Sequence, residues 1–366
     1  MENLVTPEFW QGKKVLVTGH TGFKGSWLSL WLINLGAEVA GLSLEPNTEP
    51  SLFEQLALSH DLKHCIGDIR DLNLVKNLVQ DFQPDIVFHL AAQPLVRLSY
   101  HEPVLTWQTN VLGTVNVLES LKTLDKPCVA VMITTDKCYD NKEWIYGYRE
   151  NDPLGGHDPY SSSKAGAEIA IASWAKSFFH QGNIRVVSAR AGNVIGGGDW
   201  ALDRIVPDAM RALSRGESIP VRNPYATRPW QHVLEPLGGY LTLACQLYQE
   251  LILQKGAIEG AFNFGPNLSS NRPVKALVEE ILHHWEGTWT DHSDPNAPHE
   301  ATLLNLVTDK AYHTLNWQPR WDFAQTIKQT VSWYYQAHQL SVNDTNSFKS
   351  LTLGQINTYQ SLLTQN

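Results

Sequence analysis

A glycine-rich turn directly after the first predicted strand constrains the fold of this chain more than any other feature. The turn reads Thr18-Gly19-His20-Thr21-Gly22-Phe23-Lys24-Gly25 and lies between the apolar run 15–17 and a helical pattern over 23–35. Glycines in such a turn permit a tight bend, close approach of the backbone to a pyrophosphate, and close packing of helix on strand. The N–H groups at the helix start would then face the phosphates. The pattern predicts a dinucleotide-binding site, with an ordinary glycine-rich turn as the alternative.

The cofactor is predicted to contact this turn and the ends of the next three strands. The predicted contacts are Gly19, Thr21, Gly22, Phe23, Lys24 and Gly25, followed by Ser43, Asp68, Ile69, Leu90, Ala91 and Ala92. Ser43 stands where an acidic residue usually holds the adenine ribose, and Glu45 is two residues further on. NAD is predicted rather than NADP. Asp68 is expected to hydrogen-bond the adenine, the alternative being a place in the cap region of the helix that begins near Asp71.

The first half of the chain alternates short apolar runs with helix-length amphipathic patterns. Strands are predicted near 15–17, 38–44, 86–90, 129–134 and 184–189, and helices near 23–35, 71–82, 104–122 and 162–179. This alternation predicts an α/β fold, a doubly wound parallel sheet of the Rossmann type. The looser second half, with a short strand near 262–264 and a long helix near 323–337, predicts a smaller C-terminal substrate-binding domain.

The domain boundaries follow from the same patterns. The cofactor domain is predicted over 1–193 with a contribution from 230–265, and the substrate domain over 194–229 and 266–350. The polar tail 341–366 is interpreted as a partly mobile segment.

The composition argues against several classes of partner. The chain has 366 residues and a formal net charge of -9, so it gains little from counterion release and no nucleic acid partner is expected. Its four cysteines, Cys65, Cys128, Cys138 and Cys245, form no C-x-x-C pair. They are interpreted as free thiols in a reducing compartment, and no metal site is predicted. Neither a signal peptide nor a membrane-spanning run is recognised, so a cytoplasmic protein without a membrane partner is expected.

A tyrosine and a lysine four residues apart form the predicted catalytic pair. Tyr160 and Lys164 begin a predicted helix and share one of its faces. Lowering a tyrosine pKa from about 10 to about 7 requires roughly 4 kcal/mol. One ammonium group at about 4 Å supplies up to roughly 4 kcal/mol, and an oxidised nicotinamide adds a second positive charge. Tyr160 would remove a hydroxyl proton as hydride leaves the same carbon, while Lys164 would also bind the cofactor ribose. The alternative is a helix-start tyrosine beside a solvated lysine.

Several motifs, in this order along the chain, resemble those of the extended short-chain dehydrogenase/reductase family. They are TGHTGFKG, HLAAQ (89–93), NVLGT (110–114), YSSSK (160–164) and RPWQHV (228–233), and the resemblance extends from residue 14 to about residue 333. Within that family the chain is similar to the nucleotide-sugar 4,6-dehydratases. Thr135-Asp136-Lys137 stands where the dTDP-sugar enzymes carry Thr-Asp-Glu, and together with the run 193–208 it resembles the CDP-sugar branch.

The resemblance implies a three-step dehydration that uses NAD and converts CDP-glucose into a 4-keto-6-deoxy sugar nucleotide. Tyr160 takes the 4-hydroxyl proton while hydride passes to NAD+, and Thr135 hydrogen-bonds the same oxygen. Lys137 acts at carbon 5, and protonated Asp136 is the acid for departure of the 6-hydroxyl as water. Hydride then returns to carbon 6. A lysine base needs a pKa well below about 10.4, and the alternative is a charged Lys137 that stabilises the enolate.

The resemblance also assigns residues to the substrate and suggests an assembly. Arg204 and Arg228 are expected to contact the diphosphate, and Gln93 and Asn193 are further substrate contacts. Surface salt bridges are the alternative for both arginines. Helices over 104–122 and 162–179 resemble those of the family's dimer interface, so a homodimer is expected unless their apolar faces only cover the sheet.

Two other functions compete with dehydration. A nucleotide-sugar 4-epimerase uses the same hydride step but lacks the dehydration acid. A non-catalytic NAD(P)-binding regulator would be expected to lose Tyr160 or Lys164, and this chain keeps both. For a dehydratase, the family suggests a role in making deoxysugars for cell-surface polysaccharide such as O-antigen.

Overall fold

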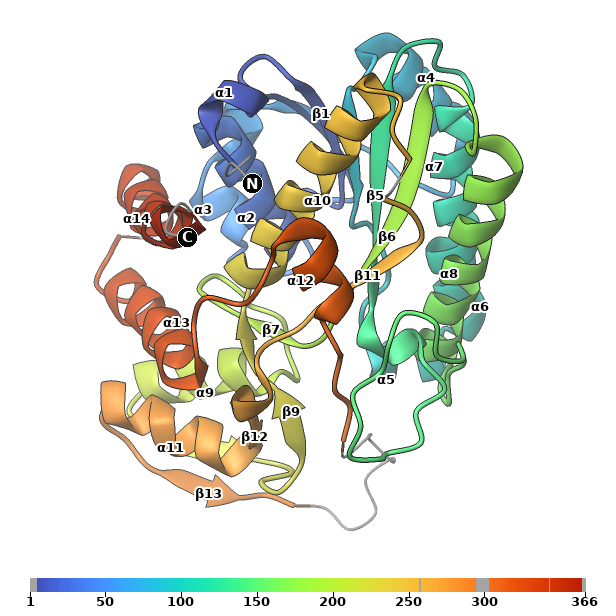
Figure 1. Cartoon of the computed structure of the whole chain (residues 1–366). Coiled ribbons are helices and arrows are strands. Elements are labelled where there is room, and N and C mark those ends of the chain that lie inside the picture. The colour runs from blue at the N-terminus through green and yellow to red at the C-terminus, as the bar shows by residue number, and fades with distance from the viewer. Residues whose placement is uncertain (1–4, 257, 294–302, 342, 364–366) are drawn as a thin grey trace.

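A seven-stranded parallel sheet forms the centre of the computed structural model, which describes residues 5–256, 258–293, 303–341 and 343–363. The strand order is β11-β6-β5-β4-β1-β2-β3. These strands are β1 (Lys14–Thr18), β2 (Glu38–Ser43), β3 (Lys63–Ile66), β4 (Ile86–His89), β5 (Cys128–Thr135), β6 (Ile184–Ala191) and β11 (Ala261–Phe264). The order reverses between β1 and β4, where open α/β sheets bind ligands beyond the carboxyl ends of their strands. The predicted doubly wound fold is confirmed (Figure 1).

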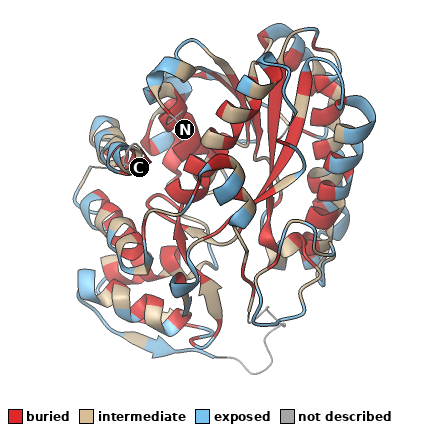
Figure 2. Cartoon of the chain, viewed as in Figure 1, coloured by how far each residue is buried: buried red, intermediate tan, exposed pale blue. Residues whose placement is uncertain are grey.

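Helices cover both faces of the sheet and enclose two apolar cores (Figure 1). On one face lie α2 (Phe23–Asn34) and α10 (Leu234–Ile252), and on the other α4 (Leu72–Phe82), α7 (Gly113–Leu121) and α8 (Pro159–Phe178). Val15 and Val17 of β1 belong to the first core and Leu16 to the second, because successive side chains of a strand point to opposite faces. Figure 2 shows that the central strands of the sheet are buried, whereas the helices of the second face expose their outer sides.

Short helical segments complete this part of the chain. They are α1 (Pro7–Trp10), α3 (Leu52–Gln55), α5 (Val96–His101), α6 (Pro103–Trp107), the 3-10 turns η1 (Leu58–His60) and η3 (Asp136–Cys138), and the π-helical turn η2 (Gln108–Leu112). The single helix predicted over 104–122 therefore runs as α6, η2 and α7.

The C-terminal lobe consists of short strand pairs and helices at one end of the sheet (Figure 1). Its strand pairs are β7 (Val194–Ile195) with β10 (Gln231–His232), β8 (Ile219–Val221) with β13 (Trp289–Asp291), and β9 (Thr227–Pro229) with β12 (Asn271–Pro273). Its helical segments are α9 (Ile205–Ser214), η4 (Leu268–Ser270), α11 (Val274–His284), α12 (Asp309–Leu315) and α13 (Phe323–Ala337). Although β11 lies late in the chain, it pairs with β6 and completes the central sheet.

The interpretation of the tail as a partly mobile segment is wrong for most of its length. Residues 345–363 form the 19-residue helix α14 (Thr345–Leu363), which packs against α2, α10 and α13. Its buried residues include Phe348, Ile356 and Tyr359, which recur at helical spacing in an otherwise polar segment. This single apolar stripe packs the helix against the rest of the protein. The prediction relied on the mean polarity of the tail, which does not reveal such a stripe.

Two features bear on location and redox state. In the described part of the chain, no helix combines the length and the apolar character that crossing a bilayer requires. The four cysteines are free thiols, as predicted, and all except the half-buried Cys65 are buried.

Candidate active site

A cavity of about 2140 Å³ lies between the carboxyl ends of the sheet strands and the C-terminal lobe. Pockets for one drug-sized ligand usually measure about 300–1,000 Å³, so this cavity has room for two ligands side by side. Every residue that the sequence assigned to catalysis, cofactor or substrate contributes to its lining. The structure thus brings the predicted site residues together, and their individual roles remain predictions.

The glycine turn has the geometry that a pyrophosphate site needs. Gly19 has a φ of +79°, and a Cβ there would lie 2.8 Å from the backbone nitrogen of Ala91. A Cβ on Gly25 would lie 2.1 Å from the carbonyl oxygen of Gly19. Gly22 is the N-cap of α2 and no side chain caps this helix end. The N-terminal amides of α2 are therefore presented to the cavity, which fits the phosphates of a dinucleotide.

At the far end of this cofactor region, Ser43 ends β2 at the predicted position. Its hydroxyl lies 2.7 Å from the hydroxyl of Thr21, which also donates a hydrogen bond to the carbonyl of Leu44. Asp68 accepts hydrogen bonds from the backbone and guanidinium of Arg70, which lowers the pKa of Asp68. Asp71, not Asp68, caps α4. Arg70 lines the cavity and is a site residue that the sequence interpretation missed.

Lys24 lies in the cofactor turn, but its side chain extends toward the catalytic residues. Its ammonium group donates a hydrogen bond to Tyr240 of α10 at 3.2 Å. Burial lowers the pKa of Lys24 to about 7, and the positive charges of Lys164 and Arg204 act in the same direction. A second ammonium group close to Lys164 could not be anticipated from the glycine pattern.

The start of α8 fixes the predicted catalytic pair. The carboxylate of Asp158 caps the helix by accepting the N–H of Ser161 at 2.9 Å, and Pro159 occupies its first position. This start places Tyr160 in the first turn, where its backbone N–H donates to the Ser99 hydroxyl. Both Tyr160 and Lys164 are buried.

The protein's own groups act on this pair in the direction opposite to activation. Burial raises the pKa of Tyr160 and outweighs the hydrogen bond from Thr135 and the charge of Arg204, so the predicted lowering of this pKa depends on the positive charge of an oxidised nicotinamide. Burial also lowers the pKa of Lys164 to about 8 and so weakens the cation that was expected to activate the tyrosine. Desolvation by the protein is therefore stronger here than the attraction of its charges.

Thr135, Asp136 and Lys137 lie where β5 ends and η3 begins. Thr135 caps η3 by accepting the N–H of Lys137 at 3.4 Å and donates to the Asp136 carboxylate at 3.0 Å. Burial raises the pKa of Asp136 against the opposing effects of Lys137, Thr135 and Arg228. The Lys137 ammonium lies 6.0 Å from the centre of the Tyr160 ring. A carboxyl group with a raised pKa and an ammonium group therefore lie beside the predicted pair Tyr160 and Lys164.

The predicted substrate contacts have different surroundings. Arg204, the N-cap residue of α9, donates to the Asp199 carboxylate at 2.9 Å and also lines the cavity, so its predicted contact with the diphosphate stays a prediction. Arg228 lies in β9, close enough to Asp136 to lower the pKa of that carboxyl.

Gln93 and Asn193 also reach the cavity wall. The Gln93 amide donates to the Thr106 hydroxyl at 2.9 Å and accepts the N–H of Leu95 at 2.5 Å, so both of its ends already have protein partners. Asn193 is half-buried between β6 and β7.

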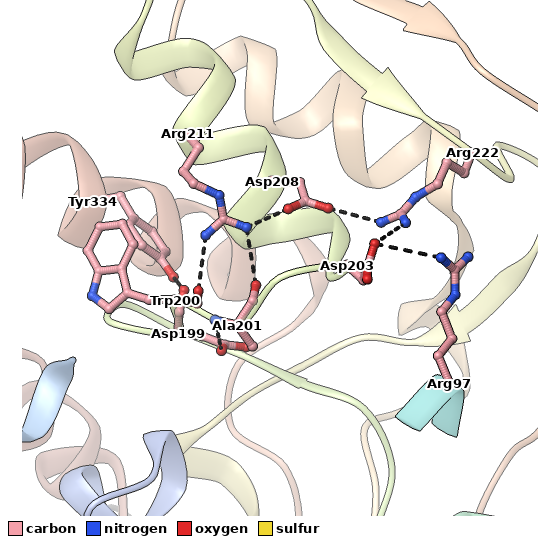
Figure 3. A network of polar contacts seen from close by, with 9 residues as sticks. All are labelled: Arg97, Asp199, Trp200, Ala201, Asp203, Asp208, Arg211, Arg222 and Tyr334. Atoms are coloured by element: carbon pink, nitrogen blue, oxygen red, sulfur yellow. Dashed lines mark hydrogen bonds and ion pairs between the residues drawn. The ribbon is translucent and has the colours of Figure 1, made fainter. Parts of the chain in front are cut away.

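A charged network at the substrate side of the cavity was not predicted (Figure 3). Asp203 lies 3.7 Å from Arg97 of α5 and 2.5 Å from Arg222. Arg222 also contacts Asp208 of α9 at 3.0 Å, and Asp208 pairs with Arg211 one turn later. These ion pairs connect the sheet side of the cavity to the C-terminal lobe. Only the Asp208–Arg211 spacing was visible in the sequence, because the other partners are distant along the chain.

Comparisons with known proteins agree with this site. Residues 16–330 match the family described as GDP-mannose 4,6 dehydratase. CDP-glucose 4,6-dehydratase of Salmonella typhimurium is 48% identical over 339 residues, which cover 90% of this chain and 93% of that protein. dTDP-glucose 4,6-dehydratase of Haemophilus influenzae is 26% identical over 355 residues, which cover 87% of this chain and 97% of that protein.

Solved structures share the fold at lower identity. dTDP-glucose 4,6-dehydratase from Bacillus anthracis, in complex with NAD, has a TM-score of 0.72 and 20% identity and covers 90% of this chain and 98% of its own. UDP-glucose 4-epimerase from Thermotoga maritima, with UDP-glucose, has a TM-score of 0.74 and 21% identity and covers 89% and 100%. Such likenesses define the fold, while the family match and the 48% identical relative confirm the resemblance drawn from the motifs. The chain belongs to the GDP-mannose 4,6 dehydratase family, among the extended short-chain dehydrogenases/reductases.

Proposed function

We propose that the protein is a hydro-lyase that converts CDP-glucose to CDP-4-keto-6-deoxyglucose with bound NAD. The observation that carries this proposal is the buried Asp136 beside Tyr160 and Lys164 in one cavity. The tyrosine and lysine suffice for hydride transfer, but loss of water needs an additional acid. Burial keeps the pKa of Asp136 raised, which favours the protonated form that an acid requires. The 48% identity to the Salmonella typhimurium enzyme supports CDP-glucose as the substrate.

The cofactor region fits NAD through its backbone. The backbone amides after Gly22 would hold the pyrophosphate. Residue 19 must be glycine because a Cβ there would collide with the backbone of Ala91. Lys164 would bind the ribose next to the nicotinamide, which is supported by its position in the same cavity wall as Tyr160. When bound, NAD supplies the acceptor for hydride from carbon 4 and the donor for its return to carbon 6.

The side chains at the end of β5 and the start of α8 divide the proton transfers between them. Tyr160 accepts the proton of the 4-hydroxyl, and Thr135 hydrogen-bonds the same oxygen. The ketone at carbon 4 acidifies the hydrogen on carbon 5, where Lys137 acts. Asp136 gives its proton to the 6-hydroxyl, which leaves as water. Burial raises the pKa of Tyr160 and so disfavours its ionised form, and a positive charge close to the phenol would oppose this effect.

The direct test is to incubate the protein with NAD+ and separate CDP-, dTDP-, GDP- and UDP-sugars. A dehydratase forms a 4-keto-6-deoxy product, detected by mass spectrometry as loss of one water. We expect it from CDP-glucose with the highest kcat/KM. A 4-epimerase would instead return a C4-inverted alcohol, and absence of any ketone would refute the dehydratase proposal.

We also propose that the protein is a cytoplasmic homodimer whose product supplies deoxysugars for cell-surface polysaccharide. Large apolar side chains are exposed on neighbouring helices: Val104 and Trp107 on α6, Leu112 on η2, and Ile169 on α8. These helices are in contact with one another, so the side chains form one surface that a second copy would cover. Ile169→Glu is expected to give a monomer in sedimentation velocity, and an unchanged dimer would contradict this interface.

A further inference from the structure

A buried hydrogen-bond network joins α8 and β6 to the ends of β5 and η3. It is not part of the chemistry described above. Its centre is an ion pair between Glu168 of α8 and Arg190 of β6, whose nitrogen and oxygen are 2.7 Å apart. The exposed fractions of the two side chains are 3% and 5%. Glu168 also accepts a hydrogen bond from Thr134 near the end of β5. It lies one helical turn after Lys164, so this carboxylate is fixed to the helix that carries the hydride-transfer pair.

The other arm of the Arg190 guanidinium reaches the segment that carries the elimination residues. Its second terminal nitrogen donates to the Tyr139 hydroxyl at 2.8 Å and to the carbonyl of Glu150 at 3.0 Å. The guanidinium carbon lies 4.9 Å from the centre of the Tyr139 ring. Tyr139 is the C-cap residue directly after η3, the turn that contains Asp136 and Lys137.

Tyr139 is held firmly from its other sides. Its hydroxyl donates to the Asn263 side chain of β11 at 2.7 Å, and its ring stacks on Tyr148 with centroids 5.1 Å apart. The Asn263 amide in turn donates to the backbone carbonyls of Tyr148 and Val307. The end of η3 is therefore fixed to β6 and β11 through a single buried phenol.

A buried ion pair of this kind needs an explanation other than stability. Removing two charges from water costs free energy that their attraction roughly repays, so the net stabilisation of a buried pair is small. A buried network in which both terminal nitrogens of a guanidinium are hydrogen-bonded does, however, hold its members in one arrangement. Catalytic groups need such support, because a shift of about 1 Å can cost about a hundredfold in rate.

We propose that Glu168 and Arg190 are positioning residues that fix η3 relative to the start of α8. The inference rests on the proposed function, in which Tyr160 acts at carbon 4 while Asp136 and Lys137 act at carbons 6 and 5 of the same sugar. Oxidation uses Tyr160 and Lys164 of α8 with one hydrogen bond from Thr135, whereas elimination also needs Asp136 and Lys137 of η3 to be in register with α8. Loosening the network therefore slows elimination selectively.

Tyr139→Phe is the smallest change that breaks the contact between Arg190 and the end of η3. It removes the hydroxyl but keeps the ring stacking and the Glu168–Arg190 pair. Turnover of CDP-glucose is expected to fall by about ten- to a hundredfold with KM within about twofold of the wild-type value. The oxidised 4-keto intermediate should accumulate together with NADH because elimination is slow, so absorbance at 340 nm should rise during turnover. In the protein without added ligands, amide hydrogen exchange should increase over 136–139 and stay unchanged over 160–164.

Ser188→Ala is the matched control, because Ser188 donates to the same Glu168 carboxylate at 2.8 Å from β6 without contacting η3. It should retain wild-type turnover and show no rise at 340 nm. Arg190→Lys, which keeps one charge but loses the two-armed contact, should behave like Tyr139→Phe. Wild-type kinetics in Tyr139→Phe, an equal loss of oxidation and elimination, or the same defect in Ser188→Ala would each overturn the inference. A wild-type protein that forms no ketone would instead refute the proposed function.

Discussion

Replacing Glu235 by glutamine should remove a specific pH dependence from the stability of the protein. Glu235 is fully buried near the start of α10. Its carboxylate accepts the backbone N–H of Trp321 at 2.6 Å, that of Arg320 at 3.0 Å, and the hydroxyl of Tyr359 in α14 at 2.7 Å. It thus joins α10 to α14 and to the segment before α13. Burial raises the pKa of Glu235 to about 7, against the lowering effect of these hydrogen bonds.

The magnitude follows from the difference between the folded and unfolded pKa. The usual value is 4.5, so the folded state holds the proton more tightly by about 3 kcal/mol. Because the folded pKa is the higher one, this stability is fully present below about pH 4.5 and is lost as the pH rises through about 7. Between about pH 5.5 and about pH 8 the loss is about 2 kcal/mol. A glutamine side chain does not titrate, so the variant lacks this contribution.

Urea unfolding of wild type and Glu235→Gln, measured over this pH range, gives the relevant difference. All other titrating groups are common to both proteins and cancel. The free energy of unfolding of the wild type, relative to the variant, should fall by about 2 kcal/mol from about pH 5.5 to about pH 8. Parallel pH profiles would show that the Glu235 pKa is not raised by burial and would refute the reasoning.

Three further predictions concern the active site. Asp136→Asn should lower kcat by about 10²–10⁴-fold while nucleotide-sugar affinity is retained, as measured by steady-state kinetics and calorimetry; an active variant would exclude Asp136 as the acid. Gly25→Ala should weaken NAD binding by at least about tenfold and destabilise the fold by about 1–3 kcal/mol, because its Cβ would lie 2.1 Å from the Gly19 oxygen. Gly354→Ala in α14 is its control, since a Cβ there meets nothing within 4 Å and should stabilise by about 0.5–1 kcal/mol. Lys137→Met should abolish uptake of solvent deuterium at carbon 5, and normal uptake would show that another group acts there.

The sequence was most informative where function depends on neighbours in the chain. The glycine turn and the Tyr160–Lys164 pair are local patterns, and their positions relative to strands and helices follow from elementary geometry. The sheet then brought Thr135 of β5 and the start of α8 into one cavity, as the order of the motifs predicted. The carboxyl ends of parallel strands meet at one edge, which makes such a convergence predictable.

The parts that were missed depend on contacts between distant segments. The Asp203 ion pairs join residues from α5, the loop before α9 and the segment after β8, and no local spacing encodes them. The α14 helix is polar on average, and its docking becomes evident only once Tyr359 is seen against Glu235. The network of Glu168 and Arg190 has the same character, because its members come from separate helices and strands.

The raised pKa values of Asp136 and Tyr160 have opposite effects in the proposed mechanism. Burial raises both, which supports the proposed role of Asp136 as an acid but opposes that of Tyr160 as a base. Thr135 contacts both groups and Arg204 favours the tyrosinate, yet together they do not overcome the desolvation of the phenol. In the proposed mechanism, ionisation of Tyr160 is therefore coupled to the arrival of further positive charge in the cavity. If Asp136 is the acid and Tyr160 the base, this coupling confines abstraction of the 4-hydroxyl proton to the cavity with its ligands bound.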